Sequence, residues 1–118
     1  MDPSPLKERT YNFALQIIRL IESLPRNRIA DVLGNQLLRC GTSVGANYRA
    51  ACRARSQADF IAKMGIVEEE ADESIYWMEL LASAGIVKPD QVRSLINEAD
   101  EILAMTVTSI RTARKRHS

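Results

Sequence analysis

The sequence predicts an all-α protein, an antiparallel up-down four-helix bundle. Apolar residues recur at steps of three and four along four segments, and no segment shows the alternation typical of a strand. The connections between these segments are short, which forces neighbouring helices to run in opposite directions. With 118 residues, 46% of them hydrophobic, the chain can enclose a core, and we expect residues 1–118 to form one domain.

The first predicted helix follows Ser4-Pro5, a suitable N-cap and first helical position, and ends at Pro25, whose ring cannot continue a helix. Its apolar stripe comprises Leu6, Phe13, Ala14, Ile17, Ile18, Ile21 and Leu24. The second helix carries Ala30, Leu33, Leu37, Cys40, Val44, Tyr48 and Ala51 on one face. Gly41, Gly45 and Cys52 lie on a separate narrow face. Each helical glycine costs about 1 kcal/mol relative to alanine, so we expect another backbone to pack closely there.

The third predicted helix begins at Ser56-Gln57-Ala58-Asp59, which has the form of a capping box with aspartate in place of glutamate. Its core face carries Phe60, Met64, Val67, Ala71, Ile75, Met78 and Leu81. Gly85 fits a C-terminal cap, and Lys88-Pro89-Asp90 starts the fourth helix. The fourth stripe comprises Val92, Leu95, Ile96, Ala99, Ile102, Leu103, Thr106 and Ile110.

The third helix has more apolar surface than one bundle core requires. Ile66, Trp77 and Leu80 fall roughly 100–160° around the helix from its core face, with Glu70 and Glu73 among or beside them. One interpretation is a deeply buried helix near the centre of the bundle. The other is a subunit interface, which we favour because a four-helix bundle has no central helix. The interface candidates are Ile66, Glu70, Glu73, Trp77 and Leu80.

Signals for catalysis or a cofactor are weak. Di-iron bundles need Glu-x-x-His motifs on two helices, whereas His117 is the only histidine. An all-carboxylate divalent site stays open as an alternative, but we expect Glu70 and Glu73 to pair with arginines of the second helix: Arg39, Arg49 or Arg53. Cys40 and Cys52 are predicted to be buried, unreactive thiols. We therefore expect no catalytic residue, no metal, no cofactor and no enzymatic activity.

Charge is distributed unevenly along the chain. Residues 1–55 have a balance of +5, residues 56–105 of −8 and residues 106–118 of +4. Basic and acidic helices could pair within one bundle, or folding and assembly could gather the basic segments into a patch for a polyanion. The candidates for such a patch are Arg26, Arg28, Arg39, Arg49, Arg53, Arg111, Arg114, Lys115 and Arg116, the last four within a basic tail at 110–118.

The sequence also predicts where the protein resides. No apolar run reaches the roughly 18 residues of a membrane helix, and the charged start lacks the apolar region of a signal peptide. Two cysteines do not make a disulfide framework, which favours a reducing compartment. We expect a cytoplasmic protein with no membrane partner.

Three segments resemble a known family. Ser43-Val44-Gly45-Ala46-Asn47-Tyr48 is similar to its Ser-(Val/Ile)-x-x-Asn-(Tyr/Ile) signature, and Ser56-x-x-Asp59-Phe60-Ile61-x-Lys63 to the start of its third helix. Glu70-Ala71-x-Glu73-Ser74-x-Tyr76-Trp77-Met78-x-Leu80-Leu81 is similar to its Glu-Ala-x-Glu-Thr-x-Tyr-Trp-Leu run. This is the bacterial "four helix bundle protein" family, named for proteins encoded in intervening sequences of 23S ribosomal RNA genes.

The resemblance implies an up-down bundle that assembles as a ring-like homopentamer. A related branch comprises accessory proteins of diversity-generating retroelements, which are basic pentamers that bind nucleic acid and a reverse transcriptase. Asn47, Glu70, Glu73 and Trp77 belong to the signature, and we assign them to packing, helix pairing or the interface. Arg49 departs from the family, whose members often carry an acidic residue after the signature, and it makes the second helix more basic.

We therefore expect a non-enzymatic homo-oligomer, a pentamer, that binds structured RNA or other nucleic acid through an assembled basic surface. The alternative is a protein-interaction scaffold or a reverse-transcriptase accessory protein with no nucleic-acid binding of its own.

Overall fold

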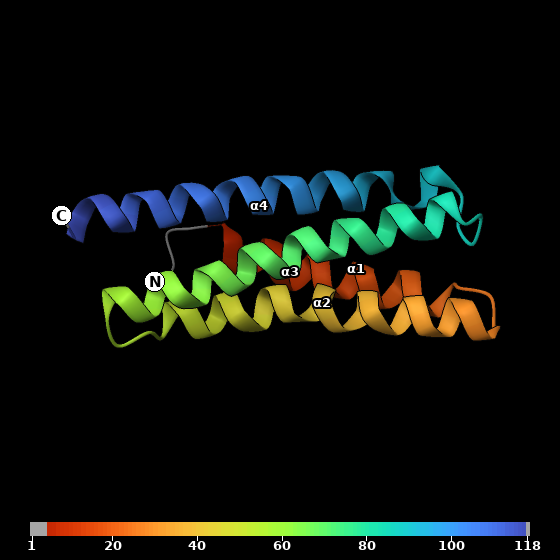
Figure 1. Cartoon of the computed structure of the whole chain (residues 1–118), viewed down its shortest axis with the longest axis horizontal. Coiled ribbons are helices and arrows are strands. Elements are labelled where there is room, and N and C mark those ends of the chain that lie inside the picture. The colour runs from red at the N-terminus through yellow and green to blue at the C-terminus, as the bar shows by residue number, and fades with distance from the viewer. Residues whose placement is uncertain (1–4, 118) are drawn as a thin grey trace.

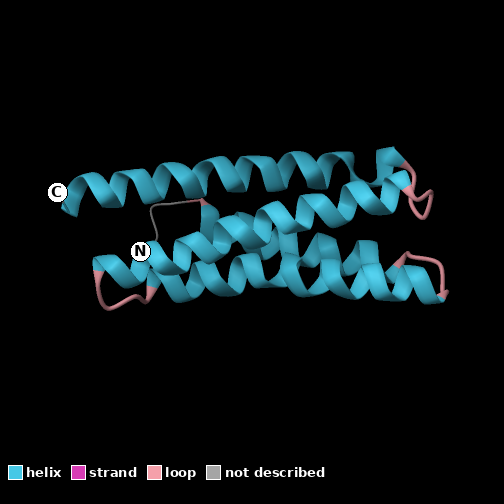
Figure 2. Ribbon diagram, viewed as in Figure 1, coloured by secondary structure: helices cyan, strands magenta, loops and turns pink. Residues whose placement is uncertain are grey.

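The computed structural model describes residues 5–117, with side chains for 5–116, and contains four helices in antiparallel order (Figure 1, Figure 2). They are α1 (Leu6–Glu22), α2 (Arg28–Cys52), α3 (Gln57–Ser83) and α4 (Pro89–His117). Each helix packs against the next, and α1 also contacts α4, which closes a bundle measuring 49 × 21 × 20 Å. Residues 5–117 contain no strand, so the predicted fold class is confirmed.

The core follows the predicted apolar faces, with one exception. Phe13 and Ile17 of α1 are fully buried, as are Val44 of α2 and Met78 of α3. Ile18, which the sequence analysis placed in the core, is 39% exposed. It lies 100° around α1 from Ile17 and therefore points away from the bundle.

The helix ends are set by local sequence. Ser56 Oγ accepts a hydrogen bond from Asp59 N at 3.0 Å, as the capping pattern predicts, and Gly85 adopts the expected positive φ of 76° after α3. Asn27 caps α2 in the same way as Ser56 caps α3. At the first helix the prediction was slightly wrong: Pro5 occupies the N-cap position and α1 ends at Glu22, three residues before Pro25. Ser4 lies outside the described residues.

The expected close approach to α2 is confirmed, and α1 makes it. A Cβ on Gly41 would lie 2.9 Å from Ile17 Cγ1, and a Cβ on Gly45 would lie 3.3 Å from the backbone oxygen of Thr10. Cys52 does not share this contact. It lies about two turns beyond Gly45 on α2, whereas α1 extends only one turn beyond Thr10 in that direction. Cys52 is exposed, contrary to the prediction that both thiols are buried.

Unequal helix lengths shape one end of the bundle. α1 has 17 residues, whereas α2 has 25, α3 has 27 and α4 has 29. At the end that holds the start of α1 and the end of α4, the longer helices extend past α1 (Figure 1). The predicted basic tail at 110–118 is helical through His117, as a continuation of α4, and Ser118 is not described. None of the helices in the described range is long and apolar enough to cross a membrane.

Candidate functional site

The bundle gathers exposed cations at one end, where α2 and α4 both finish (Figure 1). Residues 49–55 bring three arginines to this end, and residues 111–116 bring four further cations from a segment more than 50 positions away. We call this set the basic end: Arg49, Arg53, Arg55, Arg111, Arg114, Lys115 and Arg116, all of them exposed. Arg55 was not among the sequence candidates.

The basic end is weakly neutralised by the chain itself. Within residues 5–116, Arg49, Arg53, Arg111, Arg114 and Arg116 make no ion pair. Asp59 lies in the first turn of α3 near this end, but both of its carboxylate oxygens accept hydrogen bonds from Lys63 Nζ at 2.7 Å. The hydrogen bond from Lys63 lowers the pKa of Asp59. The exposed arginines are therefore available to an external anion.

The remaining sequence candidates lie elsewhere. Arg26 and Arg28 flank the start of α2, at the opposite end of the 49 Å bundle. Arg39 lies midway along α2 and pairs with Glu70 (Nη1–Oε2, 3.1 Å) and with Glu73 of α3. The structure thus brings six of the nine candidates together and separates Arg26, Arg28 and Arg39 from them.

The predicted pairing of the α3 carboxylates with an arginine is confirmed, and the partner is Arg39. Glu70 has only 13% of its side chain exposed, while Glu73 also accepts a hydrogen bond from Trp77 Nε1 at 3.0 Å. This network fixes the register of α2 against α3, and its Glu73 carboxylate orients the Trp77 ring. Within residues 5–116, no group of carboxylates, cysteines or histidines could hold a metal ion.

The surface predicted as an interface is only partly covered within the bundle. We call it the α3 flank: Ile66, Glu70, Glu73, Trp77 and Leu80. Ile66 is 42% exposed, and Trp77 and Leu80 are half-buried. Tyr76, which the sequence analysis did not select, is 56% exposed and meets the Trp77 ring edge-on with centroids 5.0 Å apart.

A second exposed apolar surface lies on α1. Tyr11 is 67% exposed, Leu15 37% and Ile18 39%, and their spacing of four and then three residues places them on one face. We call these three residues the α1 stripe. The backbones of α1 and α3 do not lie side by side, so the α1 stripe and the α3 flank lie on diagonally opposite helices. The spacing alone could have revealed the α1 stripe, but Ile18 was assigned to the core and the other two were left out.

Arg9 is a structural residue that the sequence analysis also missed. Its Nε and Nη2 atoms donate to the two carboxylate oxygens of Glu98 at 2.9 and 2.5 Å, and Nη2 also donates to Glu101 at 3.0 Å. The hydrogen bonds to Glu98 and then Glu101 raise the pKa of the Arg9 guanidinium. This cluster joins α1 to α4, and the Arg9 charge is already paired within the chain.

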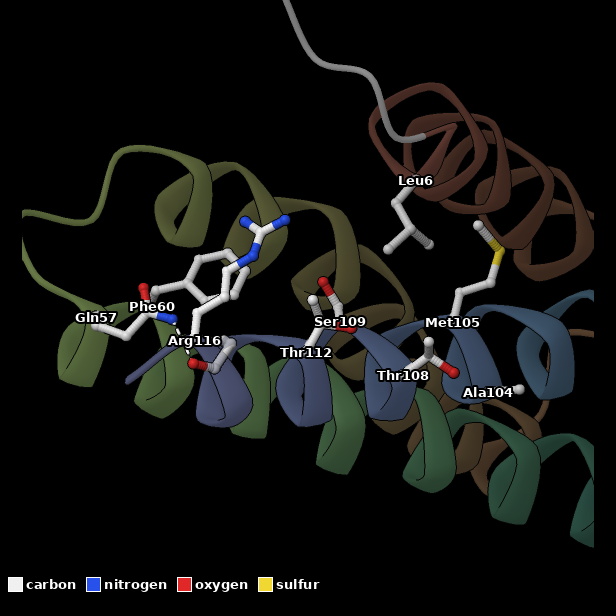
Figure 3. A pocket seen from close by; sticks show the side chains of 10 residues that line it. Leu6, Gln57, Phe60, Ala104, Met105, Thr108, Ser109, Thr112 and Arg116 are labelled. Atoms are coloured by element: carbon white, nitrogen blue, oxygen red, sulfur yellow. Dashed lines mark hydrogen bonds between the residues drawn. The ribbon is translucent and has the colours of Figure 1, made fainter. Parts of the chain in front are cut away.

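A groove of about 670 Å³ opens at the basic end, beside the start of α1 (Figure 3). We call it the α4 groove. Leu6 of α1 borders it, two residues come from the start of α3, and the rest line one side of α4. Its lining is Leu6, Gln57, Phe60, Ala104, Met105, Thr108, Ser109, Thr112, Ala113 and Arg116. No pattern in the sequence indicates this groove, because it depends on where α1 begins relative to α4.

Comparison with known proteins places this bundle in a family. The chain matches the family model described as "23S rRNA-intervening sequence protein" over residues 5–108. The chain belongs to this family. The resemblance noted in the sequence is thereby confirmed, although the match ends before Arg111. Among curated proteins the search returned no match.

A solved structure shares the fold. It is the crystal structure of a protein of unknown function from the S23 ribosomal protein family of Bacteroides thetaiotaomicron. The two chains are 38% identical, the similarity covers 89% of this chain and 97% of that one, and the TM-score is 0.84. The α1 stripe, the α3 flank and the arginines at 49–55 lie within the region that matches the family, whereas the cations at 111–116 follow it.

Proposed function

We propose that this protein is a non-enzymatic homopentamer that binds structured RNA through the basic ends of its bundles. The observation that carries the proposal is the basic end, where seven exposed cations from two distant segments come together. Arginine is well suited to phosphate, because its planar guanidinium donates two parallel hydrogen bonds. Contacts of this kind position a nucleic acid without selecting its sequence.

The unpaired state of these arginines supports the proposal. A cation that is already paired must exchange its carboxylate for a phosphate, and the lost pair offsets much of the gain. Arg49, Arg53 and Arg111 have no ion pair to break within the described residues. Arg39, which does have one, is left out of the proposed surface.

Two different apolar surfaces support the assembly. If the α3 flank of one copy contacts the α1 stripe of the next, the contact joins two unlike surfaces, and repeating it around a rotation axis closes a ring. In such a ring the same end of every copy faces the same side. The basic ends then act together and raise affinity without new contacts. The resemblance to a family of ring-like pentamers supports the number five.

The test measures binding of a labelled, fully paired RNA hairpin by fluorescence anisotropy between about 50 and 200 mM salt. We expect affinity to fall steeply with salt, because bound phosphates release counterions. The double variant Arg49→Glu/Arg53→Glu should weaken binding and reduce the slope of log K against log salt by about 2. The matched control Arg26→Glu/Arg28→Glu, at the opposite end, should leave both the affinity and the slope unchanged.

Two results would contradict the proposal. No binding at the low-salt limit would overturn it and leave the scaffold or reverse-transcriptase accessory alternative. Equal loss of binding in both double variants would show that the basic end is not the binding surface.

A further inference from the structure

The α4 groove differs in character from the exposed cations of the basic end. The α4 groove lies among the cations but is lined mostly by uncharged groups, with Arg116 as the one charged residue. Its volume of about 670 Å³ falls within the range of small-ligand sites. A paired RNA duplex presents phosphates, 2′-hydroxyls and base edges but keeps the faces of its bases stacked, so the aromatic and apolar part of the lining indicates a different part of a ligand.

Three side chains offer free hydroxyl groups along one side of the groove. Thr108, Ser109 and Thr112 follow one another along α4 (Figure 3), and none of their hydroxyls makes a hydrogen bond within residues 5–116. The other threonines behave differently: Thr10, Thr42 and Thr106 each donate to the backbone oxygen four residues earlier, at 2.7 Å. The hydroxyls in the groove can therefore both donate to and accept from a bound molecule.

The opposite side of the groove supplies an aromatic ring and a fixed amide. Phe60 of α3 is half-buried and lines the groove at the end nearest Arg116 (Figure 3). Gln57 Nε2 donates to Ala113 O at 2.7 Å, which joins α3 to α4 and leaves Gln57 Oε1 as an acceptor. Leu6 and Met105 make the far end apolar.

These groups match the parts of one nucleotide. A nucleobase has flat apolar faces that stack on aromatic rings and polar edges that bond hydroxyl and amide groups, and its phosphate pairs with arginine. A base within a duplex exposes neither face, so only an unpaired nucleotide can enter. We propose that the α4 groove binds one unpaired nucleotide of an RNA, with its base on Phe60 and its phosphate on Arg116; this rests on the proposed RNA binding.

The test compares two RNA hairpins that differ by a single unpaired adenosine in the stem. We expect the full-length protein to bind the bulged hairpin about tenfold more tightly, since stacking of one base has an effect of this size. Phe60→Leu keeps an apolar side chain but removes the aromatic face, and it should abolish the preference while leaving affinity for the paired hairpin unchanged. With 2-aminopurine as the unpaired base, emission should change on binding to the wild type, because the base leaves its stacked neighbours in the stem, and it should stay constant with Phe60→Leu.

A second pair of variants tests the hydroxyls independently of Phe60 and of any effect on folding. Thr112→Val removes a free hydroxyl at constant shape and should reduce the preference for the bulged hairpin. Thr42→Val on α2 removes a hydroxyl that bonds its own helix, and it should leave the preference intact.

The possible outcomes separate the two proposals. If neither hairpin binds, RNA binding itself is wrong and this inference falls with it. If both hairpins bind equally, or if Phe60→Leu and Thr112→Val keep the full preference, RNA binding stands and the nucleotide site in the α4 groove is wrong.

Discussion

The two cysteines show how much a single position depends on its neighbours. Cys40 is fully buried beside Ser74, whose Oγ lies 3.3 Å from the Cys40 sulfur, while Cys52 is exposed on the same helix. Burial raises the pKa of the Cys40 thiol, because the thiolate loses its hydration inside the core. Cys52, exposed on the same helix, serves as the matched control for Cys40.

Ionisation of Cys40 should make the protein less stable at alkaline pH. The unfolded chain releases the thiol proton at its ordinary pKa, whereas the folded chain retains it to higher pH. The protonated Cys40 thiol contributes fully to stability below the ordinary thiol pKa. Above that pKa, the free energy of unfolding should fall by up to about 1.4 kcal/mol per pH unit. Urea unfolding under reducing conditions at several pH values should show this fall in wild type and Cys52→Ser. Cys40→Ala should lack this part of the slope, and an identical slope in Cys40→Ala would contradict the assignment.

At the scale of the element, packing between helices decides which helical glycine is required for stability. Gly41 of α2 faces Ile17 of α1 at less than van der Waals distance for an added Cβ, whereas a Cβ on Gly65 of α3 would meet nothing within 4 Å. Both positions lie inside helices, so replacing glycine by alanine gains the same intrinsic helix preference at each.

The pair Gly41→Ala and Gly65→Ala isolates this packing effect. Gly65→Ala should raise the free energy of unfolding by about 1 kcal/mol, the preference of alanine over glycine in a helix. Gly41→Ala gains the same helix preference but forces α1 and α2 apart. Its free energy of unfolding should therefore be about 1–3 kcal/mol lower than that of Gly65→Ala. Denaturant unfolding of both variants and wild type measures the difference. Equal stability of the two variants would mean that α1 is not held tightly against Gly41.

The boundaries of the helices were the features that the sequence predicted best. The cap at Ser56, the glycine at 85 and the start of α4 at Pro89 are confirmed because each depends on contacts within a few residues. The assignment of Ile18 to the core failed because one residue step turns a side chain by 100°. Only the neighbouring helices determine which side of that step faces inward.

At the scale of the whole molecule, the proposed ring requires two different surfaces. The α3 flank and the α1 stripe lie on diagonally opposite helices, and each leaves apolar side chains exposed to solvent. Trp77 is the largest side chain of the α3 flank, and aromatic residues of this kind dominate the energetics of interfaces.

Blocking one surface at a time tests the ring. Trp77→Ala removes the centre of the α3 flank, and Leu15→Glu places a charge in the α1 stripe. Analytical ultracentrifugation should find the wild type as a pentamer and each variant shifted toward monomer. A mixture of the two variants should form a heterodimer through the one pair of intact surfaces. Val107→Ala, a half-buried position on α4, should remain pentameric.

Two outcomes would count against this arrangement. A pentamer that survives both substitutions would show that neither surface forms the contact. Two monomeric variants that fail to combine on mixing would show that the α3 flank does not meet the α1 stripe.

The sequence by itself determined the helices, most of the core and the family, because apolar periodicity, caps and short motifs are local properties of the chain. It also identified the α3 flank and the partnership of Glu70 and Glu73 with an arginine. It did not determine which cations share one end of the bundle, since residues 49–55 and 111–116 reach the same end only through the antiparallel path of the chain. Nor did it indicate the α4 groove, which exists because α1 starts at Leu6 while α4 continues through His117. Tertiary structure decided these features, because they depend on the relative lengths and rotations of helices that are distant in sequence.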